Sequence, residues 1–194
     1  HTEGHPLFTI ELLHHMQEQG VLIQDERGQW IEATELDWGD LPARVEGVIE
    51  ERVSRLEQAL RDILTAASVE GENFTAEVIA RVQAVDTREL VRRLSRELEA
   101  QHRLVRAQGI RRLRSQRLSL YRFWHNLFQR YLYRSLDPVE RTYLHEAVGN
   151  ALEHFYRSQT GEVAVQLATH FQEAGHLDKA VVYLSQAGHA AAQG

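Results

Sequence analysis

Two strand-like stretches in an otherwise helical chain constrain this sequence most. Residues 104–113 and 118–123 are rich in apolar and β-favouring side chains, and they flank the polar turn of residues 114–117. Such a pair predicts a β-hairpin. Three helical patterns precede the hairpin and one follows it. Three helices and a hairpin in this order are typical of a winged helix-turn-helix, which we assign to residues 39–136.

The helices of this segment carry recognisable start and stop signals. Gly71 is suited to end a helix that begins near residue 58. Thr75 can cap the next helix. Asp86 with Glu89 three residues later forms a capping-box pattern that opens a third. After the hairpin, the run Asp137-Pro138-Val139-Glu140 places a cap, a proline and an acid where a helix start favours each of them.

The first segment, residues 1–38, has a different pattern. Pro6 stands where a first helical turn accepts proline, and Gly20 is suited to end that helix. Apolar stretches at residues 21–23 and 30–31 flank a polar turn and predict a small second hairpin. The chain begins without a methionine and ends in an uncapped alanine run, so we expect it to be a piece of a longer protein.

Residues 137–194 predict a helical linker and one repeat-like helix pair. Large and small apolar residues alternate from Leu167 to Ala187 as they do in a tetratricopeptide hairpin. One such unit cannot bury both of its faces, so further units are expected in the parent protein. An ordinary antiparallel helix pair is the alternative. The expected fold class is therefore mainly α: a winged helix followed by antiparallel tetratricopeptide-like helices.

Composition excludes several kinds of function. The sequence contains no cysteine, which removes disulfides and thiol chemistry. It has no apolar run long enough to span a membrane, and we expect a cytoplasmic protein. The adjacent His14 and His15 point about 100° apart on a helix and cannot chelate together. His145-Glu146 lacks the second histidine of a zinc-protease motif. We therefore predict no metal site and no catalytic residue.

Three segments carry a resemblance to a known class of proteins. Gly4-His5-Pro6 resembles the glycine-x-proline motif that begins a lid helix in the signal-transduction ATPases with numerous domains, the STAND class. His125, within Tyr121–Phe128, resembles that class's histidine just after the wing hairpin. The helix pair stands where bacterial members place a tetratricopeptide array. For Pro6 and His125, an ordinary helix start is the alternative in each case.

The resemblance implies a regulatory function. In the class, the proline packs against adenine and the histidine reaches the β-phosphate of ADP, which keeps the protein in its resting state. Gly4, Pro6 and His125 would therefore contact nucleotide only together with a separate ATPase domain. This chain has no phosphate-binding loop of its own, so we expect no enzyme activity and no cofactor here. ATP or ADP with Mg²⁺ would bind the parent protein.

The resemblance also implies partners. The winged helix would pack on the protein's own nucleotide-binding domain, and the repeat array would bind a protein or a small-molecule inducer. Release of the clamp would then favour nucleotide exchange and self-association. A plain interaction scaffold, in which only the repeats matter, is one alternative.

DNA binding is a further alternative, because positive charge gathers around the hairpin. The hairpin carries four arginines near its turn: Arg111, Arg112, Arg114 and Arg117. The preceding helix adds four more: Arg88, Arg92, Arg93 and Arg96. A basic wing could lie along a phosphate backbone. Three glutamates on that helix and a net charge of −6 oppose this, so we expect no nucleic-acid partner.

Overall fold

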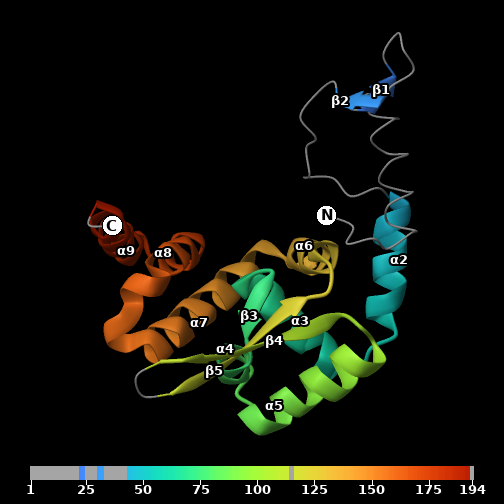
Figure 1. The fold of residues 1–194 in the computed structure, drawn as a ribbon, viewed down its shortest axis with the longest axis horizontal. Coiled ribbons are helices and arrows are strands. Elements are labelled where there is room, and N and C mark those ends of the chain that lie inside the picture. Colours follow the sequence, from blue (N-terminus) through green and yellow to red (C-terminus); the bar gives the residue numbers. More distant parts are fainter. Residues whose placement is uncertain (1–21, 25–29, 33–42, 114–115, 193–194) are drawn as a thin grey trace. The chain divides into compact units, whose positions relative to one another are not determined.

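The computed structural model describes residues 22–24, 30–32, 43–113 and 116–192 (Figure 1). The chain divides into two compact units, His1–Leu56 and Glu57–Gly194, and each is described by itself. The division falls inside the segment 39–136 that the sequence assigns to the winged helix.

The first unit contains a small hairpin and one helix. Strand β1 (Leu22–Gln24) pairs antiparallel with β2 (Trp30–Glu32), and Ile23 lies opposite Ile31. The hairpin confirms the prediction for this stretch. Helix α2 (Ala43–Ser54) follows. The predicted helix between Pro6 and Gly20 lies outside the described residues.

The second unit opens with helices that begin and end where the local signals predict. Helix α3 (Gln58–Glu70) stops at Gly71, whose φ of +136° favours glycine. Helix α4 spans Ala76–Val82. The side chain of Asp86 accepts hydrogen bonds of 3.0 Å from the backbone N–H groups of Arg88 and Glu89, and so caps helix α5. Helix α5 (Thr87–Arg93) continues directly into the π-helix η1 (Leu94–Gln101).

A three-stranded antiparallel sheet follows from the predicted hairpin and one strand that was not predicted. Strands β4 (Val105–Arg112) and β5 (Arg117–Phe123) form the hairpin. Strand β3 (Asn73–Thr75), between α3 and α4, pairs with β5, so the strand order is β3-β5-β4. Thr75 therefore ends a strand and does not cap α4 with its side chain, which corrects the prediction made for it.

Strand β4 contains one irregularity. Ala107 pairs with Tyr121 and Gly109 pairs with Leu120, so Gln108 is an extra residue in a β-bulge. Gly109 has a φ of +134°, which other residues rarely adopt.

The remaining elements are helical. Helix α6 spans Asn126–Ser135 and α7 spans Pro138–Tyr156. The 3-10 turn η2 (Arg157–Val163) leads to α8 (Ala164–Glu173) and α9 (Leu177–Ala192), which pack against each other as a helical hairpin (Figure 1). The predicted helix start is confirmed, because Asp137 accepts hydrogen bonds from the N–H groups of Val139 (2.8 Å) and Glu140 (3.0 Å).

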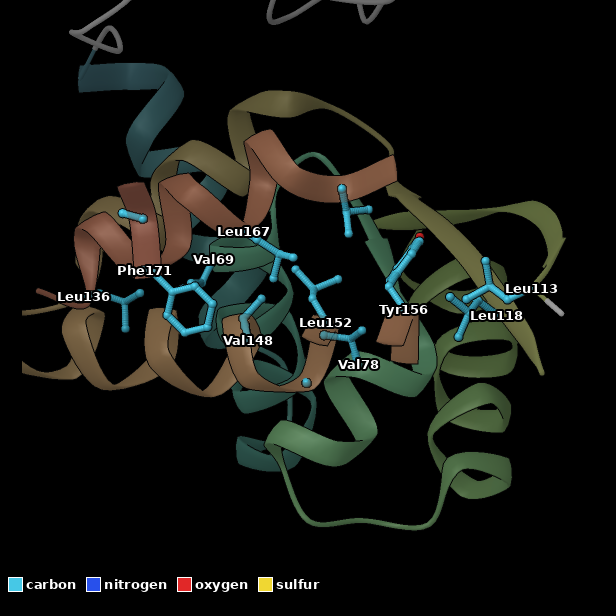
Figure 2. Packing of buried hydrophobic residues seen from close by; sticks show 13 residues of the cluster. Val69, Val78, Leu113, Leu118, Leu136, Val148, Leu152, Tyr156, Leu167 and Phe171 are labelled. Carbon is cyan, nitrogen blue, oxygen red and sulfur yellow. The ribbon is translucent and has the colours of Figure 1, made fainter. Parts of the chain in front are cut away.

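A buried hydrophobic cluster runs through the second unit (Figure 2). It draws side chains from helices α3, α4 and α7, from the turn end of the β4–β5 hairpin and from the α8–α9 pair. Its largest members include Leu118, Tyr156, Leu167 and Phe171. The predicted class is thus confirmed at the level of a mainly helical protein with a small antiparallel sheet. Among the described helices, none has the length and apolarity that crossing a membrane requires.

Candidate functional site

His125 lies between β5 and α6, where the resemblance implies a contact with nucleotide. It occupies the N-cap position of α6 in an extended conformation, but its side chain does not cap the helix. Only 3% of the residue is exposed, and the centre of its ring lies 6.4 Å from that of Phe128. An imidazole that reaches a phosphate of another domain needs an open path to it. A phosphate can reach this ring only if the residues that cover it move.

The other nucleotide-contact residues cannot be placed in the same way. Gly4 and Pro6 lie outside the described residues, and so does Arg114 of the hairpin turn. The neighbour of the histidine, Asn126, has a buried side-chain oxygen that accepts no hydrogen bond from the described part of the chain.

The hairpin arginines divide between two settings. Arg111 donates a hydrogen bond of 3.1 Å to the phenolic oxygen of Tyr156, at the end of α7. Arg112 and Arg117 lie directly opposite each other across the hairpin, and both are exposed. Like charges in opposed positions destabilise a strand pair unless an anion or water separates them. Arg111, Arg112 and Arg117 are all exposed, and Arg111 is in addition held by Tyr156.

Part of the positive charge on α5 is neutralised. Glu89 accepts hydrogen bonds from Arg92 at 3.2 Å and from Arg93 at 3.1 Å. These ion pairs hold the pKa of Glu89 below its usual range. They also reduce the charge that this helix could present to a phosphate backbone.

A cavity of about 350 Å³ lies between the sheet and the C-terminal helices. Its polar lining includes Glu70, Gln108, Arg111, Tyr156 and Gln166. Its apolar lining comes from Phe74, Leu120, Tyr121 and Val163. Strand β4, helix α7 and helix α8 thus meet at one concave site.

Glu70 is the unusual group of this cavity. The residue is 8% exposed, and one carboxyl oxygen accepts a hydrogen bond of 3.0 Å from the backbone N–H of Thr75. The pKa of Glu70 is raised to about 8, mainly because the group is buried; hydrogen bonds from Thr75 oppose the shift and the nearby charge of Glu77 adds to it. The carboxyl group is therefore mostly protonated at neutral pH. A titratable group with a shifted pKa beside a cavity is a typical mark of a binding site.

The sequence did not reveal this site, but one signal was present. Glu70 is the last residue of α3, where an acid is unfavourable because the C-terminal end of a helix carries partial negative charge. An acid there, directly after the apolar Val69 and before Gly71, indicates a special environment. Tyr156 gave no comparable signal.

The α7–α8 interface contains a second buried polar group. His145 and His170 are 4% and 3% exposed, and the hydroxyl of Tyr133 on α6 lies 3.0 Å from Nε2 of His145. Across the described ranges, no cluster of three or more histidines and acids has the spacing of a metal site.

Comparison with known proteins adds no identification. No protein-family model, curated protein or solved structure matches this chain.

Proposed function

We propose that this chain is a non-catalytic regulatory module of a larger signalling ATPase of the STAND class. In this proposal a winged helix is joined to the start of a tetratricopeptide-like array that binds a protein or small-molecule inducer. The order of α3, β3, α4, α5, β4 and β5 supports the winged helix. The strand order β3-β5-β4 supports it further, because the hairpin then extends beyond the edge of a helical body as a wing does.

The close packing of α8 on α7 and the exposed face of α9 support the repeat. Gly149 of α7 lies against the ring of Phe171 on α8, so closely that a Cβ on Gly149 would meet two ring carbons at 3.2 Å. Small residues opposite large ones allow this close helix packing. On α9, Leu177, Val181 and Leu184 leave more than half of their surface exposed. A helix face of this kind is what the next unit of an array would cover.

The observation that carries the proposal is the core that the wing and the helix pair have in common. Leu118 of β5 and Val78 of α4 belong to the same buried cluster as Leu167 and Phe171 of α8 (Figure 2). The side chain of Gln116, at the base of the wing turn, also donates a hydrogen bond to the carbonyl of Phe155 on α7. A packed core transmits displacement because it is not continuously deformable. A change at the helix pair would therefore reach the wing.

The burial of His125 changes what the proposal depends on. A ring that is 3% exposed weighs against a direct contact with ADP in this arrangement. The proposal therefore depends on the common core and not on the histidine. Clamping of ADP by His125 would require a second arrangement in which the ring is uncovered.

The coupling can be tested on this chain by hydrogen exchange. Leu167→Ala removes a fully buried side chain of the cluster and is expected to cost about 2–5 kcal/mol. Protection of the backbone amides in β5 and α4 should fall together with that in α8. Leu184→Ala, at a residue 52% exposed on α9, is the matched control and should leave β5 unchanged. Loss of protection confined to α8 and α9 would contradict the proposal.

The nucleotide part needs the full ATPase. His125→Ala in that protein is expected to raise its basal activity or its self-association. Unchanged activity with ADP still tightly held would show that the histidine does not control the resting state.

DNA binding is the second candidate, favoured by the exposed pair Arg112 and Arg117 on the wing. Phosphate contacts strengthen as salt falls, so the decisive measurement is binding to duplex DNA in low salt. Binding that disappears in the double variant Arg112→Gln with Arg117→Gln would support this candidate. Our proposal predicts no binding.

A further inference from the structure

The cavity beside Glu70 lies where the wing meets the helix pair. Gln108 and Arg111 line it from β4, Tyr156 lines it from the end of α7, and Gln166 lines it from α8. Gln166 also donates a hydrogen bond of 3.4 Å to the carbonyl of Glu70, so the α8 side is attached to α3. Any molecule held here would touch the wing and the helix pair at once.

The formal charge of the lining favours an anion. Among the described residues that line the cavity, Arg111 has a guanidinium group and Glu70 has a carboxyl group. Burial keeps the pKa of Glu70 at about 8, so at pH 7 its carboxyl group is protonated and neutral. The guanidinium of Arg111 is always charged. Within the lining itself, Arg111 therefore supplies the full charge at pH 7, while Glu77 and Glu162 act on Glu70 and Tyr156 from outside the lining.

The hydrogen-bonding groups fit the same conclusion. The phenolic oxygen of Tyr156 accepts from Arg111, so its own hydrogen remains available as a donor. Burial raises the pKa of Tyr156, which keeps the phenol protonated. A protonated Glu70 also donates. The Tyr156 hydroxyl and the Arg111 guanidinium lie within hydrogen-bond distance of each other, and that combination suits a group with two acceptor oxygens.

The size and the apolar part of the lining limit the rest of the molecule. A volume of about 350 Å³ is near the lower end of small-molecule pockets, which run from about 300 to 1,000 Å³. Phe74, Leu120 and Val163 offer apolar surface to a compact body.

We infer that this cavity binds a small organic monocarboxylate with a compact apolar or aromatic body, held by the guanidinium of Arg111 and by the hydroxyl of Tyr156. The binding itself stands apart from the proposed function. Its consequence depends on that function, because an anion between β4 and α8 would stabilise one arrangement of the wing and the helix pair.

Benzoate is a suitable probe, and benzamide is its uncharged counterpart. We expect benzoate to shift the NMR signals of the backbone amides near residues 108–111 and 164–166 of the full chain. Benzamide should bind at least about tenfold more weakly, because hydrogen bonds to a charged group contribute about 1.5–3 kcal/mol. Equal binding of the two probes, or no shift in either segment at millimolar benzoate, would overturn the inference.

Variants of Arg111 separate recognition from folding. Arg111→Gln should abolish the preference for benzoate, and Arg111→Lys, which keeps the charge, should retain part of it. Arg117→Gln, on the same hairpin but outside the lining, is the control and should bind benzoate as the unmodified chain does. Retained preference in Arg111→Gln would place benzoate elsewhere and so reject the site.

The pH dependence provides an independent readout. Benzoate affinity should fall as pH rises through about 8, because Glu70 then ionises and repels the carboxylate. Glu77, Glu162 and Arg111 are the other charged groups near Glu70 and Tyr156. Glu70→Gln should remove the fall. A fall that persists in this variant would overturn the assigned role of Glu70.

A failure of the benzoate experiments can be told apart from a failure of the proposed function. Loss of benzoate binding leaves the Leu167→Ala exchange experiment unaffected, since that experiment uses no ligand. Conversely, benzoate can bind even if protection in β5 and α8 proves independent. Each result therefore judges one proposal only.

Discussion

The Nδ1 atom of His145 lies 2.9 Å from the Nδ1 atom of His170, in the interface between α7 and α8. One of these nitrogens must donate and the other must accept, so the accepting ring is neutral. The Tyr133 hydroxyl lies at the opposite nitrogen of His145 and continues the chain of polar contacts. The interface between the helices therefore depends on the protonation state of two buried rings.

The first prediction concerns acid stability. Burial, with His145 as a second cause, lowers the pKa of His170 to about 3, whereas an unfolded histidine titrates near 6.5. The folded chain thus binds fewer protons below pH 6.5, so its stability is complete above that pH and decreases as pH falls toward 3. The unmodified chain loses free energy of unfolding between pH 6.5 and 4.5. His170→Asn should avoid up to about 3 kcal/mol of that loss, as measured by urea unfolding.

The comparison of pH slopes isolates this effect from other groups. Burial also lowers the pKa of His145, while Glu173 raises it and Arg141 lowers it, so those residues stay unchanged in the variant. The exposed His189 is the control, and His189→Asn should retain the slope of the unmodified chain. An unchanged slope in His170→Asn would show that folding does not lower the pKa of His170.

The second prediction concerns Glu70, for which the sign is opposite. Its pKa is about 8 in the folded chain and about 4.5 in the unfolded chain. The folded state therefore binds more protons, and stability that is complete below pH 4.5 is lost as pH rises through 8. Glu70→Gln should remove this dependence and be more stable at pH 7 by about 2–3 kcal/mol, measured by chemical denaturation. A variant less stable at pH 7 would contradict the prediction.

The third prediction concerns the close contact between α7 and α8. Gly149→Ala would place a methyl group 3.2 Å from two carbons of the Phe171 ring, which is fully buried and stacked on Tyr183. Overpacking should cost about 1–3 kcal/mol, partly offset by the better helix propensity of alanine. Gly188→Ala on α9 meets nothing within 4 Å and should stabilise by about 0.5–1 kcal/mol. Equal thermal shifts for the two variants would refute the packing argument.

The fourth prediction concerns the start of α7. Asp137 accepts two backbone hydrogen bonds there, so Asp137→Ala should destabilise the chain by about 0.5–2 kcal/mol. Asp137→Asn keeps an acceptor oxygen at the same position and should lose much less. Urea unfolding of both variants gives the comparison. Equal losses would mean that the side chain does not act as a cap.

The sequence predicts well the elements whose ends are set by residues close to them in the chain. Asp86, Asp137 and Gly71 set helix ends through groups within four residues of themselves, so their patterns can be read without knowing the fold. The hairpin of β4 and β5 is also local, because its strands adjoin one turn. The mainly helical class followed from these features.

The features that the sequence does not predict depend on distant partners. Strand β3 has three residues and exists because Phe74 pairs with Tyr121, 47 positions later in the numbering. The burial of Glu70 depends on the sheet and on α8, and the burial of His125 likewise depends on packing. Burial is a tertiary property, which periodicity within one segment does not encode.

The β-bulge in β4 decides on which side of the hairpin Arg111 lies. If Gln108 itself paired with Leu120, regular pairing from Ala107 onward would set Arg111 opposite Arg117 and turn it to the other side of the strand. The observed register sets Arg111 opposite Leu118. One backbone irregularity, made possible by Gly109, thus brings Arg111 to the side of the hairpin where it meets Tyr156. Straightening the strand would put Ile110 opposite Leu118 in its place, without altering a single charge in the sequence.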